Sequence, residues 1–213
     1  MNRSFKKRKA KIDRKTTETK IAGELVIDGQ GKADVKTGIG FLDHMLTLFA
    51  FHGLFDLKLK VKGDLNVDTH HSNEDVAICL GQAFKKSLGA CKGIRRFGSS
   101  EVPMDQARAR VTIDIGNRFA YTGIQLRDGK FQQALSEIRS NKAGENYSME
   151  DGNDFLETFA KNLGMNLHVN VLSESDMHHM LEAIFKALGI ALDRATEIDP
   201  RRKKTVPSSK GVL

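Results

Sequence analysis

The chain contains no tryptophan, only two cysteines and no long hydrophobic run. No apolar stretch approaches the roughly 20 residues that cross a membrane, and the basic first residues lack the apolar core of a secretory signal. Cys79 and Cys91 are too far apart for a CxxC metal motif, so we expect reduced thiols in a cytoplasmic protein. At 213 residues the chain is long enough for one globular domain or two small ones.

Several functional motifs are missing as well. The sequence has no glycine pattern of the Walker or Rossmann type, no Gly-x-Ser-x-Gly and no Cys/His nucleophile arrangement. Aromatic residues make up 7% of the chain, which leaves few stacking platforms for single-stranded nucleic acid. These absences argue against nucleotide-dependent enzymes, nucleophilic hydrolases and single-strand binders.

The basic charge is concentrated at the start of the chain. Residues 1–15 contain eight Lys or Arg and one Asp, which account for the net charge of +7, because the remaining 26 basic and 26 acidic residues cancel. We therefore expect residues 1–13 to form a basic flexible arm, more typical of a solubilising terminus than of a nucleic-acid contact. A second basic run at 201–204 is suited to attracting an anionic substrate.

Hydrophobic periodicity divides the rest of the chain into two halves with the same order of elements. The first half is predicted to have strands at 21–27, 32–37 and 57–61, a hairpin turn at 28–31, and helices at 41–52 and 70–89. The second is predicted to have a strand pair at 108–115 and 118–126, an irregular insertion at 127–152, a helix from 155, a strand at 167–171 and a helix after 178. This order predicts an α+β fold of two similar β-β-α-β-α halves, at 14–100 and 101–198, produced by internal duplication and followed by a tail at 199–213.

One five-residue motif, His-His-x-x-Glu, occurs twice, at residues 70–74 and 178–182. Each copy begins a segment with helical periodicity, so its glutamate shares a helix face with one of its histidines. Adjacent histidines on a helix point about 100° apart, which favours sending the two rings to two different metal ions. A single copy would indicate solvated surface histidines, but two copies with the same spacing in similar segments indicate metal binding.

Two further histidines complete a possible ligand set. His44 lies beside Asp43, 26 residues before the first motif, and His168 lies on the polar side of the strand at 167–171. Taken alone, His44 fits a metal ligand and a helix-surface histidine about equally well, whereas His168 fits an exposed strand histidine better. Eight ligands would give each of two metals four protein ligands and would leave positions open for water or substrate. The candidate metal ligands are His44, His70, His71, Glu74, His168, His178, His179 and Glu182.

The C-terminus offers groups suited to a phosphate. Residues 207–213 read Pro-Ser-Ser-Lys-Gly-Val-Leu, which supplies hydroxyls, backbone N–H groups and an ammonium. Arg96 and Arg118 can add guanidinium contacts to an anion. Taken alone, a tail of this composition is more often flexible than ligand-binding.

These motifs belong to a longer series that runs from about residue 14 to the end of the chain. The series comprises Gly-Phe-Leu-Asp-His-Met-Leu at 40–46, Asp-Thr-His-His with Glu-Asp at 68–75, Arg-Arg-Phe-Gly at 95–98, Pro-Met-Asp at 103–105, Asp-Met-His-His with Glu-Ala and Phe-Lys-Ala-Leu at 176–188, and the tail at 207–213. With these motifs in this order, the sequence resembles the imidazoleglycerol-phosphate dehydratase family. One departure is Gly116-Asn117 before Arg118, where the family usually has Ser-Gly.

The resemblance implies a fold of the ribosomal protein S5 domain 2-like kind, with a four-stranded sheet and two helices in each half. It implies two Mn²⁺ ions per active site, held by the eight candidate ligands, and a homo-oligomer of 24 subunits with active sites at subunit interfaces. The implied reaction is the dehydration of D-erythro-imidazole glycerol phosphate to imidazole acetol phosphate in histidine biosynthesis, through an imidazolate bound between the two metals. The implied catalytic residues are Glu18, as the proton-transfer group, and Lys186; the implied phosphate-binding residues are Arg96, Arg118, Ser208 and Lys210.

Two other classes of function fit part of the sequence. A nucleic-acid-binding module would use the basic arm, but the body of the chain is neutral and poor in aromatic residues. A metal-storage or structural zinc assembly would explain the histidines but not Arg96, Arg118 or the Ser-Ser-Lys tail, and structural zinc sites are usually rich in cysteine. We therefore expect a small phosphorylated imidazole as the partner, and neither nucleic acid nor membrane.

Overall fold

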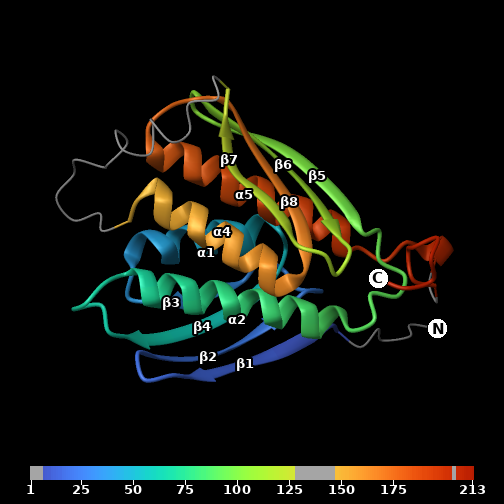
Figure 1. The fold of residues 1–213 in the computed structure, drawn as a ribbon, viewed down its shortest axis with the longest axis horizontal. Coiled ribbons are helices and arrows are strands. Elements are labelled where there is room, and N and C mark those ends of the chain that lie inside the picture. Colours follow the sequence, from blue (N-terminus) through green and yellow to red (C-terminus); the bar gives the residue numbers. More distant parts are fainter. Residues whose placement is uncertain (1–6, 128–146, 203–204) are drawn as a thin grey trace.

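The computed structural model describes residues 7–127, 147–202 and 205–213. Within these ranges, two four-stranded sheets enclose a layer of four helices (Figure 1). The first half contains β1 (Lys9–Lys15), β2 (Thr19–Val26), β3 (Ala33–Lys36), α1 (Gly40–His52), β4 (Asp56–Gly63) and α2 (His70–Leu88). The second contains β5 (Phe97–Met104), β6 (Ala107–Ile115), β7 (Ala120–Leu126), α4 (Met149–Leu163), β8 (Met165–Ser173) and α5 (Met177–Thr196), followed by a 3₁₀ turn at Pro200–Arg202. None of the helices in the described ranges is long and apolar enough to cross a membrane.

The two halves repeat one β-β-β-α-β-α unit, which confirms the predicted α+β fold of two similar halves. In each sheet the fourth strand lies between the second and the third, giving the orders β1-β2-β4-β3 and β5-β6-β8-β7. It pairs antiparallel with the second strand and parallel with the third. The predicted direct pairings across 28–31 and between 108–115 and 118–126 are therefore wrong, because β4 or β8 separates the strands concerned.

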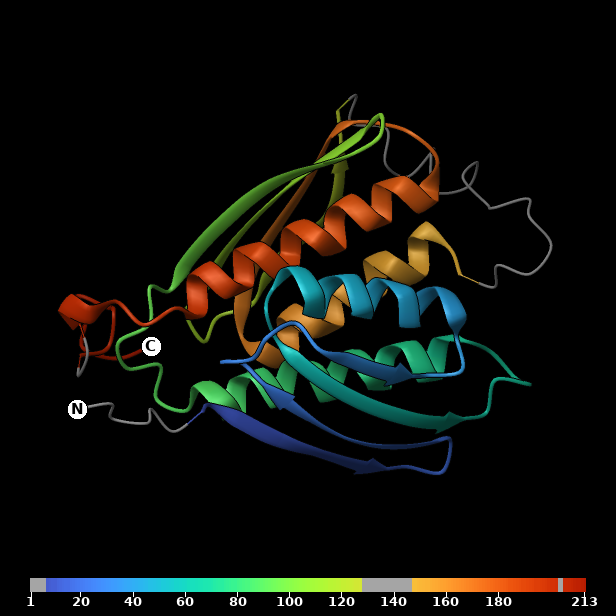
Figure 2. The same cartoon turned by 180° about the vertical axis from the view of Figure 1, so that it is seen from behind.

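Each pair of helices covers the inner face of its own sheet and packs against the other pair. α1 and α2 lie on the first sheet and α4 and α5 on the second, while α1 contacts α5 and α2 contacts α4 across the layer (Figures 1 and 2). At the centre, the rings of Phe49, Phe55, Phe84 and Phe159 pack with centroids 4.9–6.0 Å apart. A Cβ added to Gly189 would lie 2.5 Å from the carbonyl oxygen of Phe49, so the close approach of α5 to α1 requires glycine there.

The basic arm expected at 1–13 is shorter than its charge suggested. Residues 9–13 belong to β1, in which exposed polar side chains alternate with buried Ala10 and Ile12. Ala10 and Ile12 are the only buried side chains of β1, so its two-residue period is too short to distinguish a strand from a basic arm in the sequence. The first half therefore begins at β1 rather than at residue 14. Residues 1–6 lie outside the described part of the chain.

Two elements of the second half also differ from the prediction. α4 begins at Met149, inside the expected insertion at 127–152, where Ser148 and Asp151 form a reciprocal capping box. Residues 128–146 of that insertion lie outside the described residues. β5 has no predicted counterpart because its inner face carries small residues: a Cβ added to Gly98 would lie 1.9 Å from the carbonyl oxygen of Ala191 on α5.

Candidate active site

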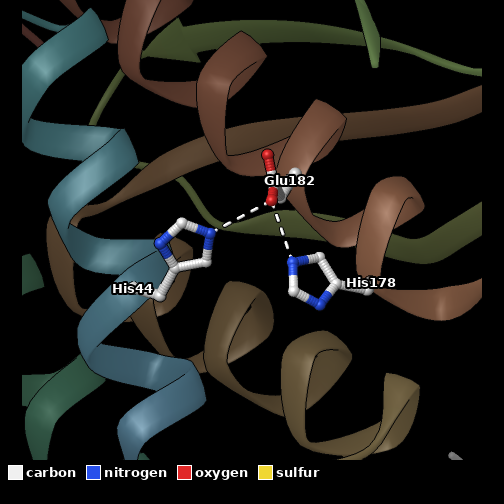
Figure 3. Close-up of side chains that lie close together, drawn as sticks. All are labelled: His44, His178 and Glu182. Atoms are coloured by element: carbon white, nitrogen blue, oxygen red, sulfur yellow. Dashed lines mark hydrogen bonds and ion pairs between the residues drawn. The ribbon is translucent and has the colours of Figure 1, made fainter. Parts of the chain in front are cut away.

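Three of the eight candidate metal ligands come together where α1 packs on α5. His44 on α1 and His178 on α5 both direct Nε2 at the same carboxylate oxygen of Glu182, at 3.0 Å and 2.9 Å (Figure 3). The three ligand atoms lie within 4.8 Å of one another, and no other group of three such ligands occurs in the described residues. Two imidazole nitrogens and a carboxylate oxygen are donors that first-row divalent metals accept, so this group, the His44 cluster, fits a metal ion.

The first turn of α5 orients the His44 cluster. Asp176 caps the helix with its side chain, and His178 and Glu182 follow one turn apart on the same face. The ring of His178 packs edge-on against Phe41, with centroids 5.1 Å apart, and Phe41 stacks in turn on buried Tyr147. Because Phe41 also lies on α1, these contacts hold the imidazole of His178 against the helix that carries His44.

Glu182 is ionised because cationic and hydrogen-bonding groups surround it. Burial alone would raise its pKa, but Lys186, His44 and His178 lower the pKa to about 2. Lys186 Nζ lies 2.6 Å from the second carboxylate oxygen of Glu182 and 3.1 Å from Met104 Sδ. The Lys186 side chain is only 13% exposed. This candidate catalytic residue therefore lies beside the His44 cluster.

The first His-His-x-x-Glu motif forms a separate group at the start of α2. His71 Nδ1 lies 3.1 Å from an oxygen of Asp64 and 3.9 Å from one of Glu18, which is in the turn between β1 and β2. The hydrogen bond with Asp64 raises the pKa of His71. His70 Nδ1 lies 3.9 Å from an oxygen of Asp154 on α4. Glu18, assigned to the site only by the resemblance, thus lies next to a candidate metal ligand.

The other three candidate ligands do not join the His44 cluster. Glu74 is exposed on α2. His179 contacts Asp176 through Nδ1, and its Nε2 lies 3.4 Å from an oxygen of Asp105. His168 is exposed on the outer face of the second sheet, whereas α4 and α5 cover the inner face. A single chain therefore does not gather all eight candidate ligands, because the sheet itself stands between His168 and the cluster.

A basic cavity of about 660 Å³ lies between the start of β5 and the C-terminal tail, and Arg96 and Ser208 both line it. Arg96 donates paired hydrogen bonds to Asp114 at 2.5 Å and 2.9 Å and a third to the carbonyl oxygen of Pro207 at 3.0 Å. The remaining lining residues are Arg95, Phe97, Asp199, Arg201, Arg202, Pro207 and Ser209. Guanidinium groups and hydroxyls converging on one cavity suit an anion such as phosphate.

The other two expected phosphate-binding residues are also exposed: Lys210 is part of the tail, and Arg118 lies close to it. Arg118 follows Asn117, whose side chain donates to the backbone oxygen of Leu213 at 3.2 Å. The backbone N–H of Lys210 donates to Ser208 Oγ at 3.2 Å. Asn117 has a φ of 54°, a left-handed conformation that asparagine tolerates better than most residues, which explains how it can replace the usual glycine.

The basic cavity and the His44 cluster lie at opposite ends of α5. The N–H of Arg96 donates to the carbonyl oxygen of Ala195 in the last turn of the helix, whereas Glu182 lies near its start. The 13 residues from Glu182 to Ala195 correspond to about 20 Å at 1.5 Å per residue. Figures 1 and 2 show the C-terminal tail at one end of α5, away from its first turn.

Several acidic residues of the site were not identified from the sequence. Asp64, Asp105 and Asp154 approach histidines through tertiary folding, so no local spacing rule reveals them. Asp176 is different, because an aspartate directly before a helix is a recognisable capping signal. Its position three residues before His179 also places it within reach of that ring.

Known proteins match the chain over almost its full length. A family model described as imidazoleglycerol-phosphate dehydratase matches residues 37–192. The imidazoleglycerol-phosphate dehydratase of a Thermoanaerobacter species is 51% identical over 207 residues, covering 97% of this chain and 100% of the relative. That of Syntrophobacter fumaroxidans is 47% identical over 211 residues, covering 97% and 98%. A crystal structure of IGPD from Pyrococcus furiosus superimposes with a TM-score of 0.73 at 34% identity, covering 95% of this chain and 100% of that one.

Fold and site define a duplicated α+β protein with a histidine–carboxylate cluster suited to a divalent metal. The identities and coverages above narrow this class to one family and confirm the resemblance drawn from the sequence motifs. The chain belongs to the imidazoleglycerol-phosphate dehydratase family and is a hydro-lyase.

Proposed function

We propose that this hydro-lyase converts D-erythro-imidazole glycerol phosphate to imidazole acetol phosphate in L-histidine biosynthesis in the cytoplasm. The reaction removes one water: the hydroxyl leaves the carbon attached to imidazole, a hydrogen leaves the next carbon, and the resulting enol becomes the ketone. The observation that carries the proposal is the His44 cluster, in a chain of this family. Imidazole nitrogens grouped with an ionised carboxylate can hold the divalent metal ion that a metal-assisted dehydration uses.

The proposed cofactor is a pair of Mn²⁺ ions in each active site. Imidazole and carboxylate donors fit this ion, and the His44 cluster supplies three of them within 4.8 Å. When bound, the ions supply positive charge that favours the deprotonated imidazole of the substrate and eases loss of the adjacent hydroxyl. The residues proposed to hold them are His44, His70, His71, Glu74, His168, His178, His179 and Glu182.

Glu18 and Lys186 have the proposed roles nearest the reacting carbons. The Glu18 carboxylate is about half exposed and lies 3.9 Å from His71, so it can accept the carbon-bound proton of a substrate placed at the first motif. Lys186 holds Glu182 ionised and oriented through the 2.6 Å contact. Both groups act from positions next to candidate metal ligands, where the substrate imidazole would also lie.

The phosphate of the substrate is proposed to bind to Arg96, Arg118, Ser208 and Lys210. The three hydrogen bonds of Arg96 leave two of its five N–H groups for the phosphate, while Asp114 fixes the guanidinium plane. Exposed Arg118 and Lys210 can add two more charge-assisted contacts.

The separation along α5 supports active sites that form between subunits. The imidazole and phosphate of the substrate lie less than about 8 Å apart, since only about five bonds of roughly 1.5 Å connect them. The basic cavity and Glu182 of one chain are about 20 Å apart along α5, so one substrate cannot reach both. Neighbouring subunits would therefore complete each site, in line with the proposed 24-subunit assembly.

The test is conversion of imidazole glycerol phosphate by metal-stripped protein with and without added Mn²⁺. We expect Mn²⁺-dependent turnover that is lost in His71→Ala and in Glu182→Ala. The matched control is His52→Ala, a histidine at the end of α1 outside the ligand set, which should retain activity. Absence of turnover by the wild-type assembly with bound Mn²⁺ would overturn the proposed reaction.

A further inference from the structure

A buried carboxylate outside the proposed ligand set connects α2 to the turn that carries Glu18. Asp75, directly after the candidate ligand Glu74, is only 7% exposed. One of its oxygens accepts a hydrogen bond from Arg14 Nε at 2.9 Å and lies 2.8 Å from a terminal nitrogen of the same guanidinium. Its other oxygen accepts the hydroxyl hydrogen of Thr19. All of these residues occur on β1, β2 or the first turns of α2.

The turn between β1 and β2 is closed by its own hydrogen bonds. Thr16 Oγ1 accepts the backbone N–H groups of Glu18, at 3.2 Å, and of Thr19, at 2.9 Å. The N–H of Thr16 in turn donates to the carbonyl oxygen of Thr19 at 2.9 Å. The turn is therefore a small rigid unit, and its connection to Asp75 fixes where the Glu18 side chain starts.

We propose that Arg14, Asp75 and Thr19 form a positioning cluster that holds Glu18 at its distance from His71. The inference rests on the proposed function, in which Glu18 transfers the substrate proton. His71 and Asp75 are one helical turn apart on α2, so the same helix end carries the candidate metal ligand and the anchor of the turn. Because His71 and Glu18 come from separate elements, the link through Asp75 adds a directional connection to the packing of α2 on β1 and β2.

Stability alone does not account for this cluster. A buried ion pair generally stabilises a fold no more than hydrophobic residues of similar volume, because removing two charges from water is costly. What the cluster adds is geometry: Arg14 directs two nitrogens at one oxygen of Asp75, and the hydroxyl of Thr19 donates to the other oxygen. Misplacing a catalytic group by about 1 Å can cost about 100-fold in rate.

The test replaces the hydroxyl of Thr19 in two backgrounds, the full-length wild type and Glu18→Gln. Thr19→Val keeps the shape and suits a strand, whereas Thr19→Ser keeps the hydroxyl. In the wild-type background we expect Thr19→Val to lower kcat by about 10- to 100-fold, with KM and Mn²⁺ affinity within about twofold, and Thr19→Ser to restore most of kcat. In the Glu18→Gln background we expect Thr19→Val to cause no further loss, because the group it positions is already absent.

Several outcomes would overturn the inference. Equal losses in both backgrounds would mean that Thr19 does not act through Glu18. Parallel losses of kcat and Mn²⁺ affinity would mean that the cluster only supports the fold of α2, and an unchanged kcat would mean that it positions nothing. Arg14→Lys, which keeps the charge but offers one nitrogen in place of two, is a second variant with the same expected loss of kcat.

The proposed function can fail separately. Wild-type protein without dehydratase activity, or a fully active Glu18→Gln variant, would remove the proposed role of Glu18 and the inference with it. An active wild type with an impaired Glu18→Gln variant, together with an unaffected Thr19→Val variant, would remove only the positioning cluster.

Discussion

Replacing Asp64 by asparagine should weaken Mn²⁺ binding about tenfold without unfolding the protein. Asp64 accepts a hydrogen bond from His71 Nδ1 at 3.1 Å, which leaves Nε2 of that ring free for a metal. The side chains of Asp64 and His71 are 24% and 34% exposed, so the interaction is only partly shielded from water. Removing a carboxylate that orients a metal-ligating histidine typically lowers metal affinity by about 10- to 100-fold. The amide oxygen of asparagine can still accept the hydrogen bond, so we expect the lower end of this range, about tenfold.

The measurement is calorimetric titration of Mn²⁺ into metal-stripped wild-type and Asp64→Asn assemblies. It should be made at about pH 8, where histidine is mostly neutral and proton competition is small. Asp68→Asn is the matched control: it lies in the same connection and loses the same charge, but Asp68 accepts the backbone N–H of His70 instead of a ring hydrogen. An Asp64→Asn affinity within twofold of wild type, or an equal loss in Asp68→Asn, would refute this explanation.

Three further predictions concern other parts of the molecule. Arg118→Gln should raise KM by about tenfold or more with little change in kcat in steady-state assays, because Arg118 is exposed and a charge-assisted bond to phosphate is worth about 1.5–3 kcal/mol. Gly189→Ala should lower the free energy of unfolding by about 1–3 kcal/mol, and with it the melting temperature, because the new Cβ would lie 2.5 Å from the carbonyl oxygen of Phe49. An unchanged melting curve would contradict the close packing. Arg201 lowers the pKa of Asp199 from 3.8 to about 2, so the pair stabilises the folded state above pH 3.8 and loses this effect as the pH falls through about 2. The melting-temperature difference between wild type and Asp199→Asn should therefore be constant at higher pH and disappear near pH 2.

The helices and the metal motifs were predictable because their signals are local. Helical periodicity and the three- or four-residue spacing within each motif are contained in a few neighbouring residues, and the His178–Glu182 contact follows that spacing. The repeated order of elements also revealed the two similar halves. His44 could be included as a candidate, but its contact with Glu182 depends on how α1 crosses α5, and no local pattern encodes that crossing.

The errors have definite physical causes. β1 was hidden because only two of its side chains, Ala10 and Ile12, are apolar and buried, and β5 because the close approach of α5 leaves room only for small residues such as Gly98. The strand order was wrong because neighbours in sequence were assumed to be neighbours in the sheet, whereas β4 and β8 insert between earlier strands. Asp64 and Asp75 act through contacts between distant segments, so only the folded chain shows their partners.

The length of α5 has a consequence for mixed assemblies under the proposed function. A subunit would contribute its first turn to one active site and the basic cavity at its last turn to another. A variant damaged only in the His44 cluster and a variant damaged only in the basic cavity would then each be inactive alone. If the two variants assemble at random in equal amounts, roughly a quarter of the sites would combine an intact His44 cluster with an intact basic cavity. Two defective gene products would then complement each other.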